Sequence, residues 1–338
     1  MPNRTVILTF ALLLALALHA GAAEKWTGLT TAEGLPGNEI QFIKQDDAGR
    51  IWIGTDSGLA LWKKGELSVL RQKGRAWDVL PLGPDNYWLG TGRGVLRVQG
   101  DSEQLHLQGN TVSPIFPYRE EVIWALAKHR GTERNAVHQH DEDGWAPVEA
   151  FKDMKVADLY RTADGTIWVA EDGDGVHAVA PEIGAEKAVH HLRGLNVTAL
   201  TRDSEGRVWC GLWNRGVRVL EDGRWDDHLA EEKTYVLGIR EDADGTIWVA
   251  TSSDGLWAWD GEIWTQHMPD AGPINLLQTT SDGRVWVSTQ SRGGLQVWDG
   301  EKWTVSLRGP LPVRCLLEAK NGWLWAGGIL DGIHIREK

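Results

Sequence analysis

Two pairs of histidines and one acidic turn carry the side chains in this sequence that most resemble metal ligands. His138 and His140 alternate along one segment, and His190 and His191 are adjacent in another. Neither pair has a Cys or Glu at a spacing that completes a zinc set. The acidic turn 171–174, Glu-Asp-Gly-Asp, resembles half of a calcium loop but lacks the Glu that ends an EF-hand. We therefore predict no metal site and no cofactor.

The signatures of common catalytic sites are absent from the sequence. It contains no G-x-S-x-G elbow, no Walker loop and no dinucleotide fingerprint. Histidine is the side chain most often used as a general acid or base, and His129 is the one candidate expected beside a central channel. We expect a binding protein rather than an enzyme, with a polysaccharide lyase or hydrolase as the alternative.

Trp213, Asn214 and Arg215 form a candidate ligand contact in a predicted polar loop. A Trp beside an amide and a guanidinium can stack on a sugar or an aromatic ligand. The alternative is that Trp213 packs locally against its neighbours. We expect its side chain to be accessible to solvent.

The elements that must position these candidates repeat along the chain. Each unit has an Asp/Gly turn, a branched apolar residue, Trp, a small residue, a polar loop, and Gly followed by Leu, Val or Ile. Eight units, the third of them eroded, are spaced 36 to 44 residues apart and centre on Trp52, Trp88, Trp124, Trp168, Trp209, Trp248, Trp286 and Trp325. A fixed period near 40 residues is typical of a propeller, in which each repeat buries its faces against its neighbours.

Each unit has four short runs of β-forming residues, separated by Gly and Asp. In unit five these runs are 197–202, 207–212, 217–221 and 224–228. The Asp-Gly and Glu-Gly pairs before the Trp strand predict a tight hairpin with a primed turn. We therefore predict an all-β, eight-bladed β-propeller with four antiparallel strands per blade.

The N-terminal segment supplies the strand that the last unit lacks. Lys25-Trp26-Thr27 matches the fourth-strand sequence Lys302-Trp303-Thr304, whereas the last unit stops after its third strand, 333–336. We expect the N-terminal strand to complete the last blade and close the ring, which removes open sheet edges. The alternative is a seven-bladed ring with unit three as an insertion.

Most of the 20 tryptophans are explained by this architecture. Eight occupy the second strands, and five occupy the fourth strands: Trp26, Trp145, Trp225, Trp264 and Trp303. Large rings at these positions suit sheets that pack face to face. Trp213 falls outside the pattern.

One segment resembles a known family of repeats. Glu33-Gly-Leu-Pro-Gly-Asn38-Glu-Ile, followed by Asp46-Asp-Ala-Gly-Arg-Ile-Trp-Ile-Gly-Thr-Asp-Ser-Gly-Leu59, is similar to the two-component-regulator propeller repeat. The resemblance extends over residues 24–338 and is poorest in unit three. In that family such units form the extracytoplasmic ligand-sensing half of hybrid histidine kinases, or stand-alone exported propellers. The resemblance implies a propeller with a sensing or binding role, and it implies no chemistry.

The binding site is expected on the face that borders the central channel. There the loop from strand two to strand three and the link from strand four to the next blade emerge together, and function concentrates on such loops. Mixed charge on this face favours a polar uncharged or zwitterionic ligand, such as a glycan, or a protein partner. The candidates are Arg93, His129, Arg130, Trp213, Asn214, Arg215, Asp254, Arg292 and Asp331, with Tyr118 and Arg119 from the expected link 109–121.

The ends and the charge of the chain bear on its location. Residues 1–22 have the basic start, apolar run and Ala20-Gly21-Ala22 site of a secretory signal peptide, followed by one propeller domain, 24–338. We expect a periplasmic or secreted protein without membrane insertion, a periplasmic assembly scaffold being a further alternative. The net charge of −12, without a basic stripe, argues against a nucleic-acid partner. Cys210 and Cys315 fall in different units and are expected to be free thiols.

Overall fold

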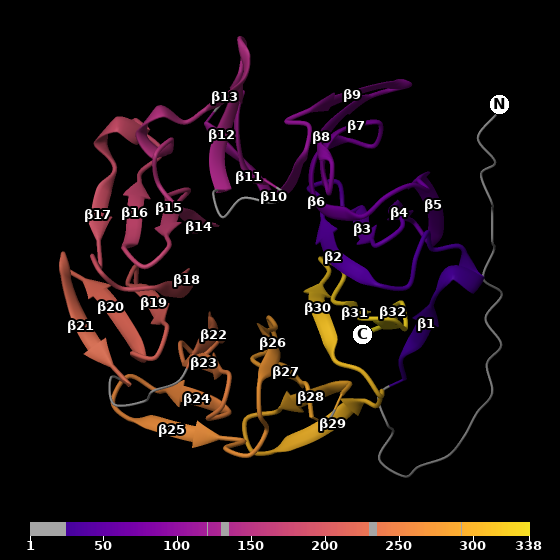
Figure 1. The fold of residues 1–338 in the computed structure, drawn as a ribbon. Helices are drawn as coiled ribbons and strands as arrows, with labels where there is room; N and C mark the ends of the chain where they lie inside the picture. Colours follow the sequence, from indigo (N-terminus) through magenta and orange to yellow (C-terminus); the bar gives the residue numbers. More distant parts are fainter. Residues whose placement is uncertain (1–24, 120, 130–134, 230–234, 292) are drawn as a thin grey trace, which may run out of the picture.

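Short runs of branched apolar residues and Trp, separated by Gly and Asp turns, form strands throughout the chain. The computed structural model describes residues 25–119, 121–129, 135–229, 235–291 and 293–338. Its strands form eight four-stranded antiparallel sheets, the blades, which surround a common centre (Figure 1). The predicted eight-bladed propeller is confirmed. The seven-bladed alternative is wrong, because unit three forms a complete blade. The predicted signal peptide, 1–22, lies outside the described residues.

The blades follow one another along the chain, and the first strand of each lies nearest the centre (Figure 1). Blade 1 contains β2 (Ile40–Gln45), β3 (Ile51–Thr55), β4 (Leu59–Lys63) and β5 (Glu66–Arg71), and blade 2 contains β6 (Ala76–Gly83), β7 (Asn86–Thr91), β8 (Gly94–Gln99) and β9 (Ser102–His106). Blade 3 contains β10 (Asn110–Arg119), β11 (Val122–His129), β12 (Asn135–Asp141) and β13 (Gly144–Pro147), and blade 4 contains β14 (Val156–Arg161), β15 (Ile167–Glu171), β16 (Gly175–Val179) and β17 (Val189–His191).

The second half of the ring has the same order. Blade 5 contains β18 (Val197–Arg202), β19 (Val208–Leu212), β20 (Val217–Glu221) and β21 (Arg224–His228), and blade 6 contains β22 (Val236–Glu241), β23 (Ile247–Thr251), β24 (Leu256–Trp259) and β25 (Trp264–His267). Blade 7 contains β26 (Ile274–Thr279), β27 (Val285–Thr289), β28 (Leu295–Trp298) and β29 (Trp303–Leu307), and blade 8 contains β30 (Val313–Glu318), β31 (Leu324–Gly328), β32 (Ile333–Arg336) and β1 (Thr27–Leu29). Three 3-10 turns lie between strands: η1 (Thr31–Glu33), η2 (Glu149–Phe151) and η3 (Ala185–Lys187).

The two ends of the propeller meet in blade 8, as the sequence predicted. β1 pairs antiparallel with β32, in a register that joins Thr27 to Ile335 and Leu29 to Ile333. Leu29 and Ile333 are buried in one core cluster with residues of blade 1. The ring is therefore closed by backbone pairing between the N-terminal strand and the last blade (Figure 1).

The second-strand tryptophans form the core of the blades. All eight are at most 4% exposed. In blades 1, 5 and 6 the indole Nε1 of this Trp donates to an Asp six residues earlier, as from Trp209 to Asp203 Oδ2 at 2.7 Å. Asp203 also accepts from the backbone N and the Nε of Arg207. One carboxylate thus joins the hairpin turn to the buried ring.

The hairpin turn itself differs from the predicted type. The Gly206 N–H donates to the Asp203 carbonyl, and Gly206 has a φ of 90°, whereas Glu205 does not have a positive φ. A primed turn of type I′ needs positive φ at both central residues. The turn is therefore a wider one in which only the last residue, Gly, is left-handed.

Contacts between neighbouring blades repeat around the ring. A fourth-strand Trp packs edge-on against the second-strand Trp of the preceding blade in four places, as for Trp303 and Trp248, whose ring centroids are 6.1 Å apart. We call each of these contacts an interblade seam. The predicted structural role of the second- and fourth-strand tryptophans fits these contacts.

Two further expectations concern the thiols and the membrane. Cys210 and Cys315 are both free, and burial raises the pKa of Cys315 to about 12. Both thiols therefore stay protonated and unreactive at neutral pH. Across the described ranges, no helix has the length and apolar character needed to cross a membrane.

Candidate functional site

The loops expected to carry function do emerge on one face. The loop from strand two to strand three hydrogen-bonds to the segment that leads into the first strand of the same blade or of the next one. Examples are Trp213 N to Asn196 O at 3.0 Å and Gly109 N to Arg93 O at 3.0 Å. We call this side of the ring the loop face.

A cavity on the loop face lies beside blade 2 and is basic. It has a volume of about 630 Å³, and Arg71, Lys73, Arg75 and Arg93 line it together with Trp77 and Glu103. Arg71 forms an ion pair with Glu103, with its Nη1 2.7 Å from Oε1. Arg75 lies over the Trp77 ring, 5.0 Å from its centroid. Within the described ranges, Lys73 and Arg93 form no ion pair.

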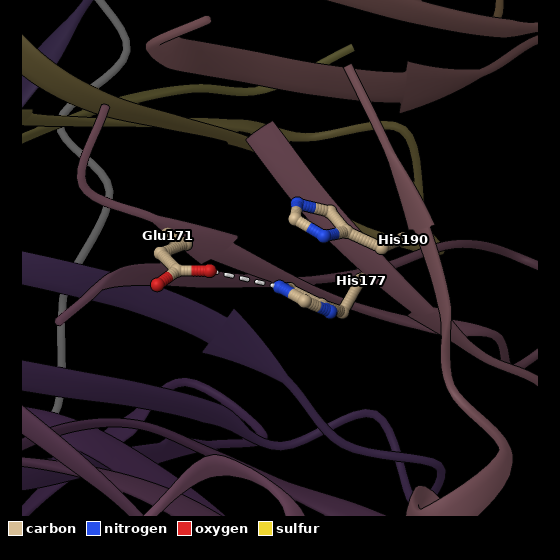
Figure 2. Close-up of side chains that lie close together, drawn as sticks. All are labelled: Glu171, His177 and His190. Atoms are coloured by element: carbon tan, nitrogen blue, oxygen red, sulfur yellow. Dashed lines mark hydrogen bonds and ion pairs between the residues drawn. The ribbon is translucent and has the colours of Figure 1, made fainter. Parts of the chain in front are cut away.

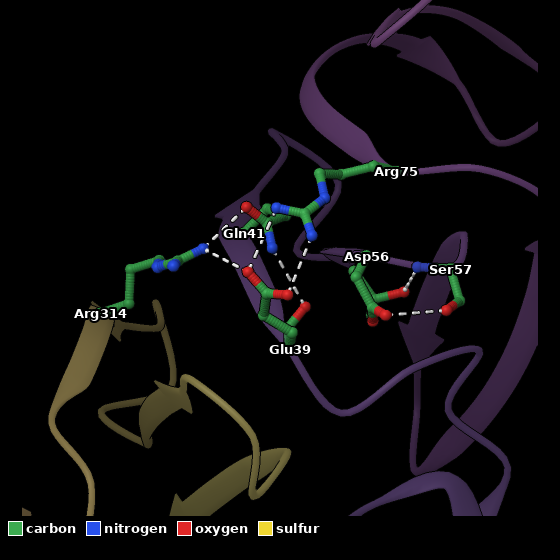
Figure 3. Close-up of polar contacts among 7 residues, drawn as sticks. Glu39, Gln41, Asp56, Ser57, Arg75 and Arg314 are labelled. Carbon is green, nitrogen blue, oxygen red and sulfur yellow. Dashed lines mark hydrogen bonds and ion pairs between the residues drawn. The ribbon is translucent and has the colours of Figure 1, made fainter.

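Arg75 of this basic pocket also belongs to a polar cluster with Glu39, Gln41 and Arg314 (Figure 3). Glu39 accepts from Arg75 of the link into blade 2, at 3.0 and 3.2 Å, and lies 3.3 Å from Arg314 of blade 8. Gln41 accepts from Arg314 at 2.7 Å. Burial acts to raise the pKa of Glu39, but the Gln41 hydrogen bond and the two arginines outweigh it and lower that pKa. Glu39 is therefore ionised and ties blades 8, 1 and 2 together.

Trp213, Asn214 and Arg215 lie on the loop face of blade 5, as predicted. The Trp213 side chain is 52% exposed, and Tyr235 supports its ring edge-on at a centroid distance of 4.9 Å. Trp213, Arg215 and Asn196 line a groove of about 340 Å³ that also includes Gly173 and Gly194. Asn214 is exposed with a φ of 56°. The groove thus combines an aromatic ring with a cation and an amide.

The remaining loop-face candidates do not join either cavity. His129 is exposed at the end of β11. Asp254 completes its own turn, with its backbone N bonded to Thr251 and its carboxylate to Ser253. Asp331 lies 3.1 Å from His334 Nε2 in blade 8. Arg130 and Arg292 lie outside the described residues.

The placement expected for Tyr118 and Arg119 is wrong. Residues 110–119 form β10, the first strand of blade 3, rather than a link. Asn110 pairs with His129 at the end of β10 that lies on the loop face, and Arg119 pairs with Val122 at the opposite end. Arg119 is therefore away from the loop face. The Tyr118 hydroxyl donates to Ile183 O at 2.8 Å and Arg119 Nε donates to Pro181 O. Both side chains anchor blade 4 to blade 3.

One cluster of potential metal ligands was missed by the sequence analysis. Glu171, His177 and His190 meet in blade 4 (Figure 2). His177 Nε2 lies 3.0 Å from Glu171 Oε2, and the two imidazole rings stack at 4.0 Å. His177 is separated from His190 by the η3 loop, so spacing along the chain did not connect them. The two histidines lie opposite each other in the β16–β17 hairpin, and the pairing of these strands is the signal that could have connected them.

Two of the repeats match a known family of repeats. The family model described as two component regulator propeller matches residues 34–57 and 232–253. The first match covers β2 and β3 of blade 1, and the second covers the corresponding part of blade 6. None of the curated proteins compared with this sequence matches it.

Solved structures share the fold at low sequence identity. The extracellular domain of a protein named as a hybrid two component system, BT4673 from B. thetaiotaomicron, is 13% identical with a TM-score of 0.52, over 90% of this chain and 51% of that one. Virginiamycin B lyase from Staphylococcus aureus is 12% identical with a TM-score of 0.58, over 93% and 98%. PorZ of Porphyromonas gingivalis is 15% identical with a TM-score of 0.51, over 89% and 46%.

This chain spans about half the length of the extracellular domains from B. thetaiotaomicron that it matches. At such identities the likeness concerns the fold alone. The family match adds the repeat type, which the sequence analysis expected from the same residues of unit one. The family model for two component regulator propeller repeats thus matches two of the units that build this ring, those of blades 1 and 6.

Proposed function

We propose that this chain is an exported, sensor-type propeller that binds a small anionic ligand in the basic pocket of its loop face. The observation that carries the proposal is the meeting of four cationic side chains, Arg71, Lys73, Arg75 and Arg93, around one cavity of a chain whose net charge is −12. Two of them, Lys73 and Arg93, have no ion-pair partner among the described residues. A bound anion would be the ion-pair partner of both side chains.

The size and lining of the pocket support a small-molecule ligand. Its volume of about 630 Å³ lies in the range of roughly 300–1,000 Å³ that ligand sites occupy. Arg71 and Arg75 are held in place by Glu103 and Glu39, so their guanidinium groups are positioned before the ligand arrives. Guanidinium groups recognise carboxylates and phosphates by paired hydrogen bonds. These features favour an acidic sugar, a dicarboxylate or a sugar phosphate over the uncharged ligand expected from the sequence.

The Trp213 groove supports a second ligand type, a neutral glycan. The ring of Trp213 is exposed and braced by Tyr235, and Arg215 and Asn196 stand beside it. Such a platform binds sugars by stacking and by hydrogen bonds at its edge. Trp213→Ala should weaken binding of a neutral glycan, whereas Ile263→Ala, at a 61% exposed position in the β24–β25 turn, should not.

The proposed location and the alternatives follow from the comparisons. Export is supported by the predicted signal peptide and by the extracellular neighbours. A lyase remains the enzymatic alternative because virginiamycin B lyase shares the fold. An assembly scaffold remains a further alternative because PorZ, a surface component of the type-IX secretion system, shares it too.

The test is a titration of the chain with matched anionic and neutral ligands. Uronic acids, dicarboxylates and sugar phosphates are each compared with an uncharged analogue by thermal shift and calorimetry. An anionic ligand should raise the unfolding temperature, and the rise should shrink with added salt. Lys73→Ala and Arg93→Ala should each weaken binding roughly 10- to 100-fold, since a hydrogen bond to a charged group contributes about 1.5–3 kcal/mol.

Arg224→Ala is the matched control, because Arg224 is exposed in the β20–β21 hairpin turn on the other face. It should leave the affinity unchanged. Equal binding of a neutral analogue, or unchanged affinity in Lys73→Ala and Arg93→Ala, would contradict the anionic-ligand proposal. If no ligand shifts the wild type, the scaffold alternative is favoured instead.

A further inference from the structure

Three side chains from adjacent strands of blade 4 converge on one point. His177 in β16 and His190 in β17 are direct cross-strand partners. Glu171 ends β15, two residues beyond Val169, which is the β15 partner of His177. The potential ligand atoms of the three residues all lie within 4.8 Å of one another (Figure 2). The geometry of the sheet therefore gathers two imidazoles and a carboxylate without any contribution from a loop.

The other blades show what these positions need for folding alone. The position of Glu171 is Thr in four blades, and Thr55, Thr91 and Thr251 donate to the carbonyl of a Gly in their own loop. The position of His177 is Ala60 in blade 1 and Leu96 in blade 2, and that of His190 is Gln266 in blade 6. A histidine stands at the position of His177 in blades 3 and 8 as well, His138 and His334. The propeller thus folds with small, apolar or amide side chains at all three places, and it is the combination of three ligating types that sets blade 4 apart. Their joint replacement by metal-ligating types in blade 4 needs another reason.

The orientation of the histidines suits a metal. His177 Nε2 faces Glu171 Oε2 at 3.0 Å. His190 Nε2 lies 2.5 Å from the carbonyl O of Asp174. Metal-binding histidines commonly give their second ring N–H to such a carbonyl, which turns the first nitrogen toward the metal. The side chains of His177 and His190 are only 8% and 10% exposed.

We propose that Glu171, His177 and His190 bind a divalent transition metal, zinc fitting best. Zinc takes imidazole nitrogen and carboxylate oxygen at about 2.0–2.2 Å, and two His with one Glu is a set that leaves a fourth position open. Binding requires the tautomer of neutral His177 that carries its proton on Nδ1, so that Nε2, which faces Glu171, offers its lone pair to the metal. His177 also lines a groove of about 620 Å³ between blades 3 and 4, so a water or an oxygen-donor ligand can reach the fourth position. The site is separate from the basic pocket and departs from the expectation of no metal.

The experiment measures zinc binding to the full tag-free chain after treatment with a chelator. Calorimetry with ZnCl₂ should give one site per chain, and Co²⁺ at the same site should give visible absorption bands. Glu171→Thr, His177→Leu and His190→Gln each introduce a residue that another blade carries at that position, so these variants are expected to fold. Each should weaken zinc binding by more than the roughly 10- to 100-fold caused by loss of an outer partner.

His334→Leu is the matched control. His334 occupies in blade 8 the position of His177 and contacts Asp331, but its strand neighbours there are Ala326 and Gly28. Zinc binding should survive this change. Circular dichroism of each metal-free variant establishes that it is folded. Absence of stoichiometric zinc binding by the wild type, or binding that Glu171→Thr and His190→Gln leave intact, would overturn the proposal.

Discussion

The Asp that precedes the Trp strand in blades 1, 5 and 6 joins local turn chemistry to the core. Asp203 closes the hairpin through the Arg207 N–H at 2.8 Å and accepts the indole N–H of Trp209 at 2.7 Å. A buried indole N–H without a partner carries its full desolvation cost. The Asp therefore explains why the repeat keeps an acidic residue six positions before the Trp in blades 1, 5 and 6.

This carboxylate gives a direct prediction for stability. Asp203→Ala leaves the Trp209 indole and the Arg207 guanidinium without their partner, so the free energy of unfolding should fall by about 2–3 kcal/mol. Urea unfolding followed by far-UV circular dichroism measures the loss. Asp270→Ala, at an exposed position, should change it by less than about 0.5 kcal/mol. A loss no larger than in this control would show that the hydrogen bond to Trp209 contributes little.

The roles of some single residues could be predicted from the sequence, and those of others could not. The structural tryptophans could be assigned because their role depends only on position in the repeat. The exposure of Trp213 was predictable for the same reason, since it breaks that pattern. The cluster at His177 was not, because Glu171, His177 and His190 become neighbours only through the pairing of three strands. The basic pocket at Arg93 was missed likewise, since its other cations come from the end of β5 and from the link that follows it.

A histidine recurs in the fourth strands, where it lies inside the interblade seam. His228 lies 5.5 Å from Trp209 of its own blade, and its Nδ1 is 3.4 Å from the indole Nε1 of Trp264 in the next blade. His267 has the same relation to Trp248 and Trp303. An indole N–H is a donor only, so the imidazole must accept and therefore be neutral. Protonation would remove the acceptor from the seam.

The seams predict a loss of stability in acid. Burial lowers the pKa of His228 and His267 from about 6.5, and for His228 the nearby Asp226 and Asp227 only partly oppose it. Below pH 6.5 the unfolded chain thus binds protons that the folded chain does not, and stability falls as the pH falls toward the lowered pKa values. Each histidine contributes a slope of up to about 1.4 kcal/mol per pH unit.

Urea unfolding between pH 8 and pH 5 tests this slope. The double variant His228→Gln/His267→Gln keeps an acceptor for each indole but does not titrate, so its stability should depend less on pH. His129→Gln, at an exposed position, should behave as the wild type. The idea fails if the double variant and the wild type lose stability in parallel.

At the scale of the whole molecule, the ring depends on one short strand. The number of blades and the closure by β1 were predictable, because Trp26 continues a pattern that the last repeat leaves incomplete. The exact role of β10 was not, since unit three has lost the Gly and small residues that mark the other units. Closure by β1 places backbone hydrogen bonds, rather than side-chain packing alone, across the join between the chain ends. Opening the ring must break that pairing.

A circular permutant separates these two kinds of closure. Residues 31–338 are followed by 24–30, with Lys338→Gly, which places four residues between Arg336 and Trp26, as between Trp298 and Trp303 in blade 7. Blade 8 then becomes one continuous unit, and only packing joins it to blade 1. The permutant should fold with the same circular dichroism but unfold faster and at a lower temperature, because no strand pairing spans the new ends. The intact chain carrying Lys338→Gly is the control, and a permutant as heat-stable as this control would mean that side-chain packing alone holds the ring closed.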